Sequence, residues 1–272
     1  MAASGNGDDA GAENVRTADA LLAASRPEHP RAKGGSGHGR HQLPHRVRDL
    51  IRSAVLAGTY SSGDQLIEEA LVHLHGASRN AMRHALQQLL AEGVVSRAPR
   101  RGTYPSWAGA RVHVLDVYRI DGGRMEPGGM HRELVASTPY LREKLQTDER
   151  MLRMVETTSM LGGEPLGIRT VYFSSRFDME TEARRGTSPI TLAEVIAGIF
   201  ARELGRVTTE ISATVADAGV ARILGVAPSS PVLRREQLIH DDDGRPVEIA
   251  FDALRADRAT FTMFDDPHLA PA

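Results

Sequence analysis

A three-residue turn between two helix-like segments constrains this chain more than any other feature. Residues 78–93 read Ser-Arg-Asn-Ala-Met-Arg-His-Ala-Leu-Gln-Gln-Leu-Leu-Ala-Glu-Gly. The apolar positions at helical spacing are Ala81, Ala85, Leu86, Leu89 and Leu90, and the other face carries Arg79, Asn80, Arg83, His84 and Gln87. We therefore expect a helix that buries one stripe and exposes a polar, arginine-bearing face.

The ends of this helix and of the one before it can also be predicted. Ser78 suits an N-cap, because its hydroxyl can accept from a free N–H of the first turn, and Gly93 suits the position just past the C-terminus. Residues 67–75 form a second, shorter helical segment closed by Gly76. The connection from Gly76 to Ser78 has the length that a helix-turn-helix requires.

Two strand-like pieces follow the second helix. Residues 94–97 and 102–104 flank a basic tip at 98–101, and an earlier helix over 44–57 begins at Pro44. Arginine can pair with guanine edges or phosphate, asparagine can pair with adenine, and a helix N-terminus offers N–H groups to phosphate. The glycine at 102 would let the hairpin approach DNA closely. The alternative is an ordinary helix and hairpin with solvated charges.

Several motifs in this region resemble the winged helix-turn-helix of GntR-family bacterial transcription regulators. They are Asp64-Gln-Leu-Ile-Glu-Glu-Ala-Leu71, Gly76-Ala-Ser-Arg79, Met82-Arg-His-Ala-Leu86, Ala91-Glu-Gly-Val-Val95 and Arg101-Gly-Thr-Tyr104. The family commonly has Thr or Pro in place of Asn80 and Ala81, so the operator sequence cannot be transferred. Together with the helix pattern, the resemblance predicts DNA contacts from Arg48, Ser78, Arg79, Asn80, Arg83, Arg100, Arg101, Gly102 and Thr103.

Charge and composition narrow the class of protein. The net charge is −2, yet residues 41–105 hold eight arginines against five acids, so the basic excess lies where DNA would be contacted. The chain has no cysteine, which excludes disulfides and thiol chemistry. It has neither an apolar run of membrane-spanning length nor a signal-peptide pattern at its start. We expect a cytoplasmic protein with no membrane partner.

The chain divides into four predicted parts. Residues 1–40 are rich in Ala, Gly, Ser, Asp and Arg and should be disordered, 41–105 form the DNA-binding domain, 106–111 are a linker, and 112–268 form a second domain. Trp107, the only tryptophan, is expected to pack between the domains. His38, His41 and His45 lie in a glycine-rich setting without acidic partners, so we predict loop histidines and no metal site.

The second domain contains a repeat with a spacing of 81 residues. Residues 163–168, Gly-Glu-Pro-Leu-Gly-Ile, recur as residues 244–249, Gly-Arg-Pro-Val-Glu-Ile, and each copy reads as strand, turn and strand after a short helix. Between the copies, residues 192–204 form an amphipathic helix. We expect a strand over 111–121, a loop at 126–129 and a helix over 138–146.

This half resembles the UTRA effector domain of HutC-like GntR regulators, on residues 160–173, 221–234 and 243–248. The resemblance implies a chorismate-lyase-like domain with a mostly antiparallel sheet, so the whole chain is expected to be α+β. Several members of that branch hold a phosphate or carboxylate of the effector with two arginines, at positions that here are Thr157 and Ser159. Hydroxyls do not neutralise an anion, which disfavours a phosphorylated sugar. The predicted effector-binding residues are His131, Arg132, Thr157, Ser159, Arg169, Glu248 and Asp252.

These features favour a ligand-responsive transcription regulator, a repressor that binds a palindromic operator as a homodimer and is released or modulated by a small-molecule effector. Its partners would be double-stranded operator DNA, the effector and a second copy of the chain, with no cofactor. Two alternatives stay open: a structural DNA-binding protein without effector, and an enzyme of lyase-like fold. No catalytic constellation supports the enzyme, and the acidic run 241–243 reads as a hairpin tip.

Overall fold

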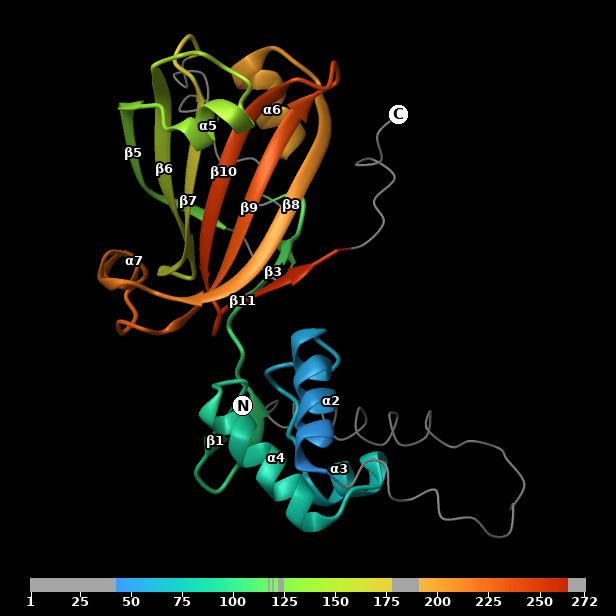
Figure 1. Ribbon diagram of the computed structural model, residues 1–272. Coiled ribbons are helices and arrows are strands. Elements are labelled where there is room, and N and C mark those ends of the chain that lie inside the picture. Colours follow the sequence, from blue (N-terminus) through green and yellow to red (C-terminus); the bar gives the residue numbers. More distant parts are fainter. Residues whose placement is uncertain (1–42, 117, 119, 122–124, 178–190, 264–272) are drawn as a thin grey trace, which may run out of the picture. The chain divides into compact units, whose positions relative to one another are not determined.

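A computed structural model describes residues 43–116, 118, 120–121, 125–177 and 191–263. Residues 1–40, which are expected to form a disordered tail and include His38, lie outside the described residues, as does His41. The chain forms two compact units that divide between Trp107 and Ala108 (Figure 1). Each unit is described by itself below.

In its described residues, 43–107, the first unit has three helices and a two-stranded hairpin. Its elements are α2 (Pro44–Leu56), α3 (Glu68–His75), α4 (Arg79–Ala91), β1 (Val95–Ala98) and β2 (Gly102–Pro105). The predicted helix ends are confirmed, since Ser78 Oγ accepts from the N–H of Ala81 at 3.2 Å and Gly76 takes the left-handed conformation at φ 57°. The hairpin is joined to the turn before α3 by the N–H of Leu66, which donates to Thr103 O at 2.8 Å.

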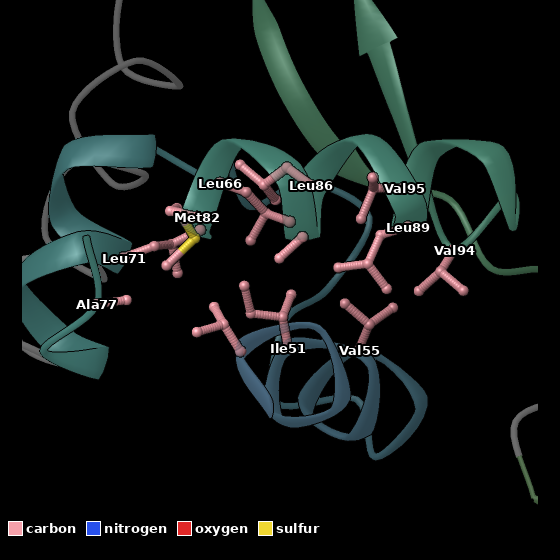
Figure 2. Close-up of a cluster of buried hydrophobic side chains, with 12 residues drawn as sticks. Ile51, Val55, Leu66, Leu71, Ala77, Met82, Leu86, Leu89, Val94 and Val95 are labelled. Atoms are coloured by element: carbon pink, nitrogen blue, oxygen red, sulfur yellow. The ribbon is translucent and has the colours of Figure 1, made fainter. Parts of the chain in front are cut away.

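The core of the first unit lies between α2 and α4. Figure 2 shows Ile51 and Val55 of α2 pointing toward Leu86 and Leu89 of α4, and these four side chains are buried. Trp107 packs against this same core, and its expected place between the two domains stays a prediction. The stripe predicted from helical spacing is therefore the one that holds the helices together.

The second unit is built on a six-stranded antiparallel sheet with the order β5-β6-β7-β10-β9-β8. Among the residues that the structure describes, a three-stranded sheet, β11-β3-β4, and three helices complete it. The elements are β3 (Ala110–His113), β4 (Ile120–Asp121), β5 (Glu126–Ala136), α5 (Pro139–Lys144), β6 (Met151–Leu161), β7 (Glu164–Ser174), α6 (Leu192–Phe200), β8 (Leu204–Val215), α7 (Ala218–Leu224), β9 (Pro231–Asp241), β10 (Pro246–Arg255) and β11 (Ala259–Thr262). The predicted α+β class with an antiparallel sheet is thus confirmed.

The repeat forms the middle of the large sheet. Each copy is a hairpin, β6–β7 and β9–β10, and the two hairpins meet where β7 pairs with β10. Both turns contain a glycine at positive φ, Gly163 at 78° and Gly244 at 77°. The 81-residue spacing therefore predicts the centre of the sheet.

Three predicted element ranges were wrong. The strand expected over 111–121 is two short strands, β3 at Ala110–His113 and β4 at Ile120–Asp121. Residues 126–129 are not a loop but the start of β5, where the register against β6 shifts between Pro127 and Met130 and accommodates the proline and the two glycines. The helix expected to reach Leu204 ends at Phe200, because Ala201 adopts the left-handed conformation and the chain then enters β8. Strand β8 itself was not predicted.

Both faces of the large sheet are covered by different elements at different heights (Figure 1). On one face, α6 covers Val171, Phe173 and Ala250, and the small sheet covers Leu166 and Leu254. On the other face, α5 packs at one end and α7 at the other. Among the described residues, no helix combines the length and the apolar character needed to cross a membrane.

Replacing Leu89 by alanine tests the core of the first unit. Leu89 is fully buried, so Leu89→Ala is expected to lower the free energy of unfolding of this unit by about 2–5 kcal/mol. Trp107 is the only tryptophan and packs on this core, so its fluorescence in a urea titration reports the unit alone. Leu74→Ala is the matched control, because the Leu74 side chain is 53% exposed and should change stability by less than about 0.5 kcal/mol. Equal effects would contradict the assigned core.

Candidate DNA interface and effector site

The outward face of α4 carries the predicted DNA-contacting side chains. Arg79 and Arg83 are one helical turn apart, with 75% and 59% of their side chains exposed. Asn80 and the N-cap Ser78 are exposed beside them. The structure therefore gathers four of the predicted residues at the N-terminal half of one helix, where polar side chains and helix N–H groups can meet nucleic acid together.

Acidic residues of α3 contact these two arginines. Arg79 Nη2 lies 3.4 Å from Glu69 Oε1, and Arg83 Nη2 lies 3.8 Å from Glu68 Oε1. Both pairs are solvent-exposed, and exposed pairs of this kind contribute only about 0–1 kcal/mol. The arginines can therefore exchange these carboxylates for phosphate or base edges at small cost.

The hairpin tip presents a second basic group. Arg100 and Arg101 are exposed, and Arg100 takes a positive φ of 62° within the tight turn. The turn is closed by the N–H of Arg101, which donates to Ala98 O at 3.0 Å, and by Tyr104 Oη, which donates to Arg101 O at 2.8 Å. Thr103 is half-buried and its carbonyl is used within the domain. Hydrogen bonds within the hairpin therefore fix the conformation of the tip.

Gly102 has a structural role within its own domain. Its φ is +112°, and a Cβ at this position would lie 2.3 Å from Nε2 of Gln65. The backbone conformation and the contact with Gln65 therefore both favour glycine here. The close approach of Gly102 to DNA stays a prediction.

Arg48 is not brought together with Arg79 and Arg83. Its guanidinium donates to Asp49 Oδ1 at 2.7 Å and lies 3.7 Å from Glu92, the residue that caps the far end of α4. The hydrogen bond to Asp49 raises the pKa of Arg48. Since α4 rises by about 1.5 Å per residue, Arg48 sits roughly 20 Å along the helix from Arg79.

A buried cluster of charged side chains lies on one face of the large sheet. Arg169 on β7, Asp252 on β10 and Arg235 on β9 are register neighbours on adjacent strands. Asp252 accepts from Arg169 Nη1 at 3.1 Å and from Arg235 Nε at 2.8 Å. The three residues are at most 4% exposed. They lie between the part of this face covered by α6 and the part covered by the small sheet.

Glu248 and Gln237 complete the cluster. Glu248 Oε1 accepts from Arg169 Nη2 at 3.0 Å, and Gln237 Oε1 accepts from Arg169 Nη1 at 3.3 Å. Burial raises the pKa of Glu248, and the attraction of Arg169 only partly offsets it. Burial acts in the same direction on Asp252, but Arg235 and Arg169 together hold the pKa of that carboxyl below its usual range. Two guanidinium groups and two carboxyl groups thus share one enclosed site.

Only some of the predicted effector residues share a face with this cluster. Thr157 is the register partner of Arg169 and its Oγ1 donates to Arg169 O at 3.5 Å, while Ser159 follows two residues along β6. Arg132, on the edge strand β5, points to the same face of the sheet as Thr157. Its Nη2 lies 3.0 Å from Met130 Sδ.

His131 does not belong to this site. It pairs with Glu156 and so points to the opposite face of the sheet from Thr157 and Arg169, because successive side chains on a strand alternate. Placing His131 in the same site was therefore wrong. Its Nε2 lies 3.8 Å from Glu133 Oε1 on the exposed edge strand.

Arg235 and Gln237 were not predicted as site residues. The sequence offered one signal, the spacing of two residues. Arg235 and Gln237 lie at every second position between the apolar Leu233 and Ile239, so all four side chains point to the same covered face of the sheet. A hollow of about 330 Å³ near α6 is lined by Ala197, Ala201, Arg202, Glu203 and Asp242, and it contains none of the predicted residues. In the part of the chain that the structure describes, no group of three or more His, Asp or Glu side chains is placed to hold a metal ion.

Comparison with known proteins finds a matching family model for each of the two units. Residues 43–104 match the model of the gntR family of bacterial regulatory proteins, and residues 130–260 match the UTRA domain. An uncharacterised HTH-type transcriptional regulator of Rhizobium meliloti is 26% identical over 78% of this chain and 90% of its own length. The mannosyl-D-glycerate transport/metabolism system repressor MngR of Escherichia coli is 22% identical over 83% of this chain and 96% of its own.

A solved structure shows the same fold. PhnF from Mycobacterium smegmatis aligns over 81% of this chain and 99% of its own with a TM-score of 0.52 and 19% identity. A GntR DNA-binding domain followed by a UTRA effector-binding domain is the architecture of a ligand-responsive transcriptional regulator. The chain therefore belongs to the GntR family of bacterial transcriptional regulators, in the HutC-like group that carries a UTRA domain.

Proposed function

We propose that this regulator is a cytoplasmic repressor that binds a palindromic operator as a homodimer through residues 41–105 and is released by a small molecule bound within residues 112–268, with 106–111 as the linker. The observation that carries the proposal is the exposed arginine face of α4, whose opposite stripe is the core of the domain. A two-fold symmetric operator matches a protein dimer, and two half-sites double the contacts. The relative MngR is named a repressor.

In this proposal α4 lies in the major groove. Arg79 and Arg83 would contact base edges, because a guanidinium can donate two hydrogen bonds to guanine, and the amide of Asn80 can pair with adenine. Ser78 and the first N–H groups of the helix would contact phosphate. The hairpin tip would add backbone contacts from Arg100, Arg101 and Thr103, with Gly102 shaping the turn. Arg48 is proposed only as a phosphate contact, since it must loosen two ion pairs to reach DNA.

The proposed effector site comprises Thr157, Ser159, Arg169, Glu248 and Asp252, with Arg132 at its rim. The charges of Arg169 and Arg235 are already matched by Glu248 and Asp252. A phosphate would bring unbalanced negative charge into a buried site, which is costly. We therefore propose an uncharged, hydroxyl-bearing effector.

Two other functions are less well supported. The curated relatives are transcriptional regulators, and we assign no catalytic residue and no cofactor to this chain. A structural DNA-binding protein would share the α4 face but would have no use for the enclosed polar cluster. Thermal-shift screening of neutral polyols and sugars separates this alternative from a sensor, because only a sensor is stabilised by a bound metabolite.

Arg79→Ala tests the DNA-binding face. With full-length protein and a fragment of the chain's own promoter, the substitution should weaken binding by about 1–3 kcal/mol, roughly 5- to 150-fold, because a bidentate contact to a base is lost. Binding measured in a gel-shift titration is the readout. Arg222→Ala, which removes an exposed arginine on α7 in the second unit, is the control and should leave affinity unchanged. An affinity of Arg79→Ala for the promoter fragment equal to that of the wild type would contradict the proposed interface.

The buried cluster predicts a pH-dependent stability of the second unit. The pKa of Asp252 is lower in the folded protein than in the unfolded chain, so its contribution is present above the unfolded value of about 4 and is lost as the pH falls through the folded value. At pH 7, Asp252→Asn should destabilise the unit by about 3–5 kcal/mol, because Arg235 stays buried without its carboxylate. Urea unfolding of the β-sheet circular dichroism signal is the measurement.

The difference between wild type and Asp252→Asn should shrink as the pH is lowered below about 4. Asp257→Asn is the matched control, since Asp257 pairs with Arg255 at 2.7 Å but 55% of its side chain is exposed, and it should cost no more than about 1 kcal/mol. If the two substitutions cost the same at pH 7, the buried cluster does not stabilise the sheet as argued.

A further inference from the structure

Two side chains of β9 hold the start of the second unit through its backbone. Arg235 Nη1 donates to His113 O and to Val114 O, both at 3.1 Å. Gln237 Nε2 donates to Val114 O at 3.3 Å and to Leu115 O at 3.1 Å. Four donor contacts thus converge on three consecutive carbonyl groups at the end of β3, and both side chains are at most 1% exposed.

The same two side chains belong to the buried charge cluster. Arg235 Nε donates to Asp252, and Gln237 Oε1 accepts from Arg169. Each residue therefore has one end in the proposed effector site and the other on the segment 113–115. Protein interiors are close-packed, so a shift of Asp252 or Arg169 is expected to move the side chains of Arg235 and Gln237 with it.

The held segment closes β3, the first strand of the second unit after the chain leaves the DNA-binding domain. Strand β3 starts at Ala110, three residues past Trp107, and its parallel partner is β11. The N–H of Val114 donates to Thr262 O at 2.8 Å, and Asp116 accepts from the N–H of Leu192 at the start of α6. Movement of residues 113–115 would thus act on β3, which leads back to the covalent connection between the domains.

Two buried donors of the cluster are unused. Arg169 Nε and Arg235 Nη2 have no hydrogen-bond partner, although both atoms are fully enclosed. A buried donor without an acceptor costs about 1–3 kcal/mol. An oxygen-bearing ligand that supplied acceptors here would remove this cost and would draw both guanidinium groups toward itself.

We propose that Arg235 and Gln237 are the coupling residues that transmit occupancy of the effector site to the connection between the domains. This inference rests on the proposed effector function. When a ligand oxygen engages Arg235, and Arg169 shifts with it, the donors on the carbonyls of 113–115 weaken and the segment loosens. Both residues act through the segment they hold, so they are positioning residues and need not contact DNA.

A hydrogen-exchange double-mutant cycle on the full chain tests the proposal without any ligand. Gln237→Met keeps the shape of the side chain but removes the donors to Val114 O and Leu115 O, so the amides of 114 and 115 should exchange about two- to tenfold faster. Glu248→Gln perturbs the effector site, 3.0 Å from Arg169, without contacting the segment, and should also speed their exchange. Because the two changes act through one path, the combined effect should be smaller than the product of the single effects.

Thr209→Val is the matched control. It removes the hydroxyl that also accepts from Gln237 Nε2, at 3.2 Å, but leaves the carbonyls of 113–115 in place, so exchange there should stay at the wild-type rate. If Gln237→Met does not fold, Gln237→Glu keeps an oxygen for Arg169 while still removing the donor. Multiplicative effects of the two substitutions, or an unchanged exchange rate in Glu248→Gln, would overturn the coupling.

Affinity for the promoter fragment separates this inference from the proposed function. Gln237→Met should weaken binding by about two- to tenfold, as expected for the released state, while Thr209→Val should bind as wild type. Failure of wild type and Thr209→Val to bind the fragment would count against the repressor, not against the coupling seen by exchange. Normal binding by Gln237→Met with loosened 114–115 amides would show that the segment does not control the DNA-binding domain, and would overturn the proposal.

Discussion

Burial of the apolar stripe of α4 decides what the rest of the DNA-binding domain can do. Met82, Ala85 and Leu89 are fully enclosed against α2, which fixes the rotation of the helix about its axis. A helix fixed in this way must turn Arg79 and Arg83 outward, since residues four apart share a face. The hairpin depends on the same packing, because Val94 and Val95 enter the same core directly after the helix. The face proposed for sequence recognition is therefore set by how the domain is packed.

In the second unit, a buried charge cluster takes the place that an apolar residue set would fill in a purely structural sheet. Replacing a buried ion pair by apolar side chains is often neutral or stabilising, so such a cluster gives weak support to stability and needs another reason. Its arrangement suggests one: Asp252 joins two arginines, one of which also holds the chain where it enters the domain. The cluster connects a candidate binding site to the backbone of residues 113–115, at the end of the first strand of the second unit. Ligand sensing and signal transmission can then share a few residues.

Local patterns predicted the DNA-binding domain almost completely, since caps, turn glycines and helical spacing act within a few residues. The 81-residue repeat predicted the two central hairpins for the same reason. The edge strand β8 was missed because its burial alternates weakly, and the first residues of β5 were read as a loop because of their proline and glycines, which the structure absorbs in a register shift. Arg235, Gln237 and the misplaced His131 needed cross-strand register, which depends on contacts between distant parts of the chain. The role of Gly102 needed the position of Gln65, which no local motif encodes.

The most direct test of the central claim is in vitro selection of duplexes from a random pool by the full-length protein, followed by footprinting of the enriched sites. The account predicts one enriched sequence with two-fold symmetry, half-sites about one helical turn apart, and protection of the major groove at each half-site. Salt dependence of binding to that sequence should be steep, as expected for several phosphate contacts per half-site. A pool with no enrichment over non-specific binding, or protection confined to the minor groove, would contradict the assignment of α4 as the recognition helix.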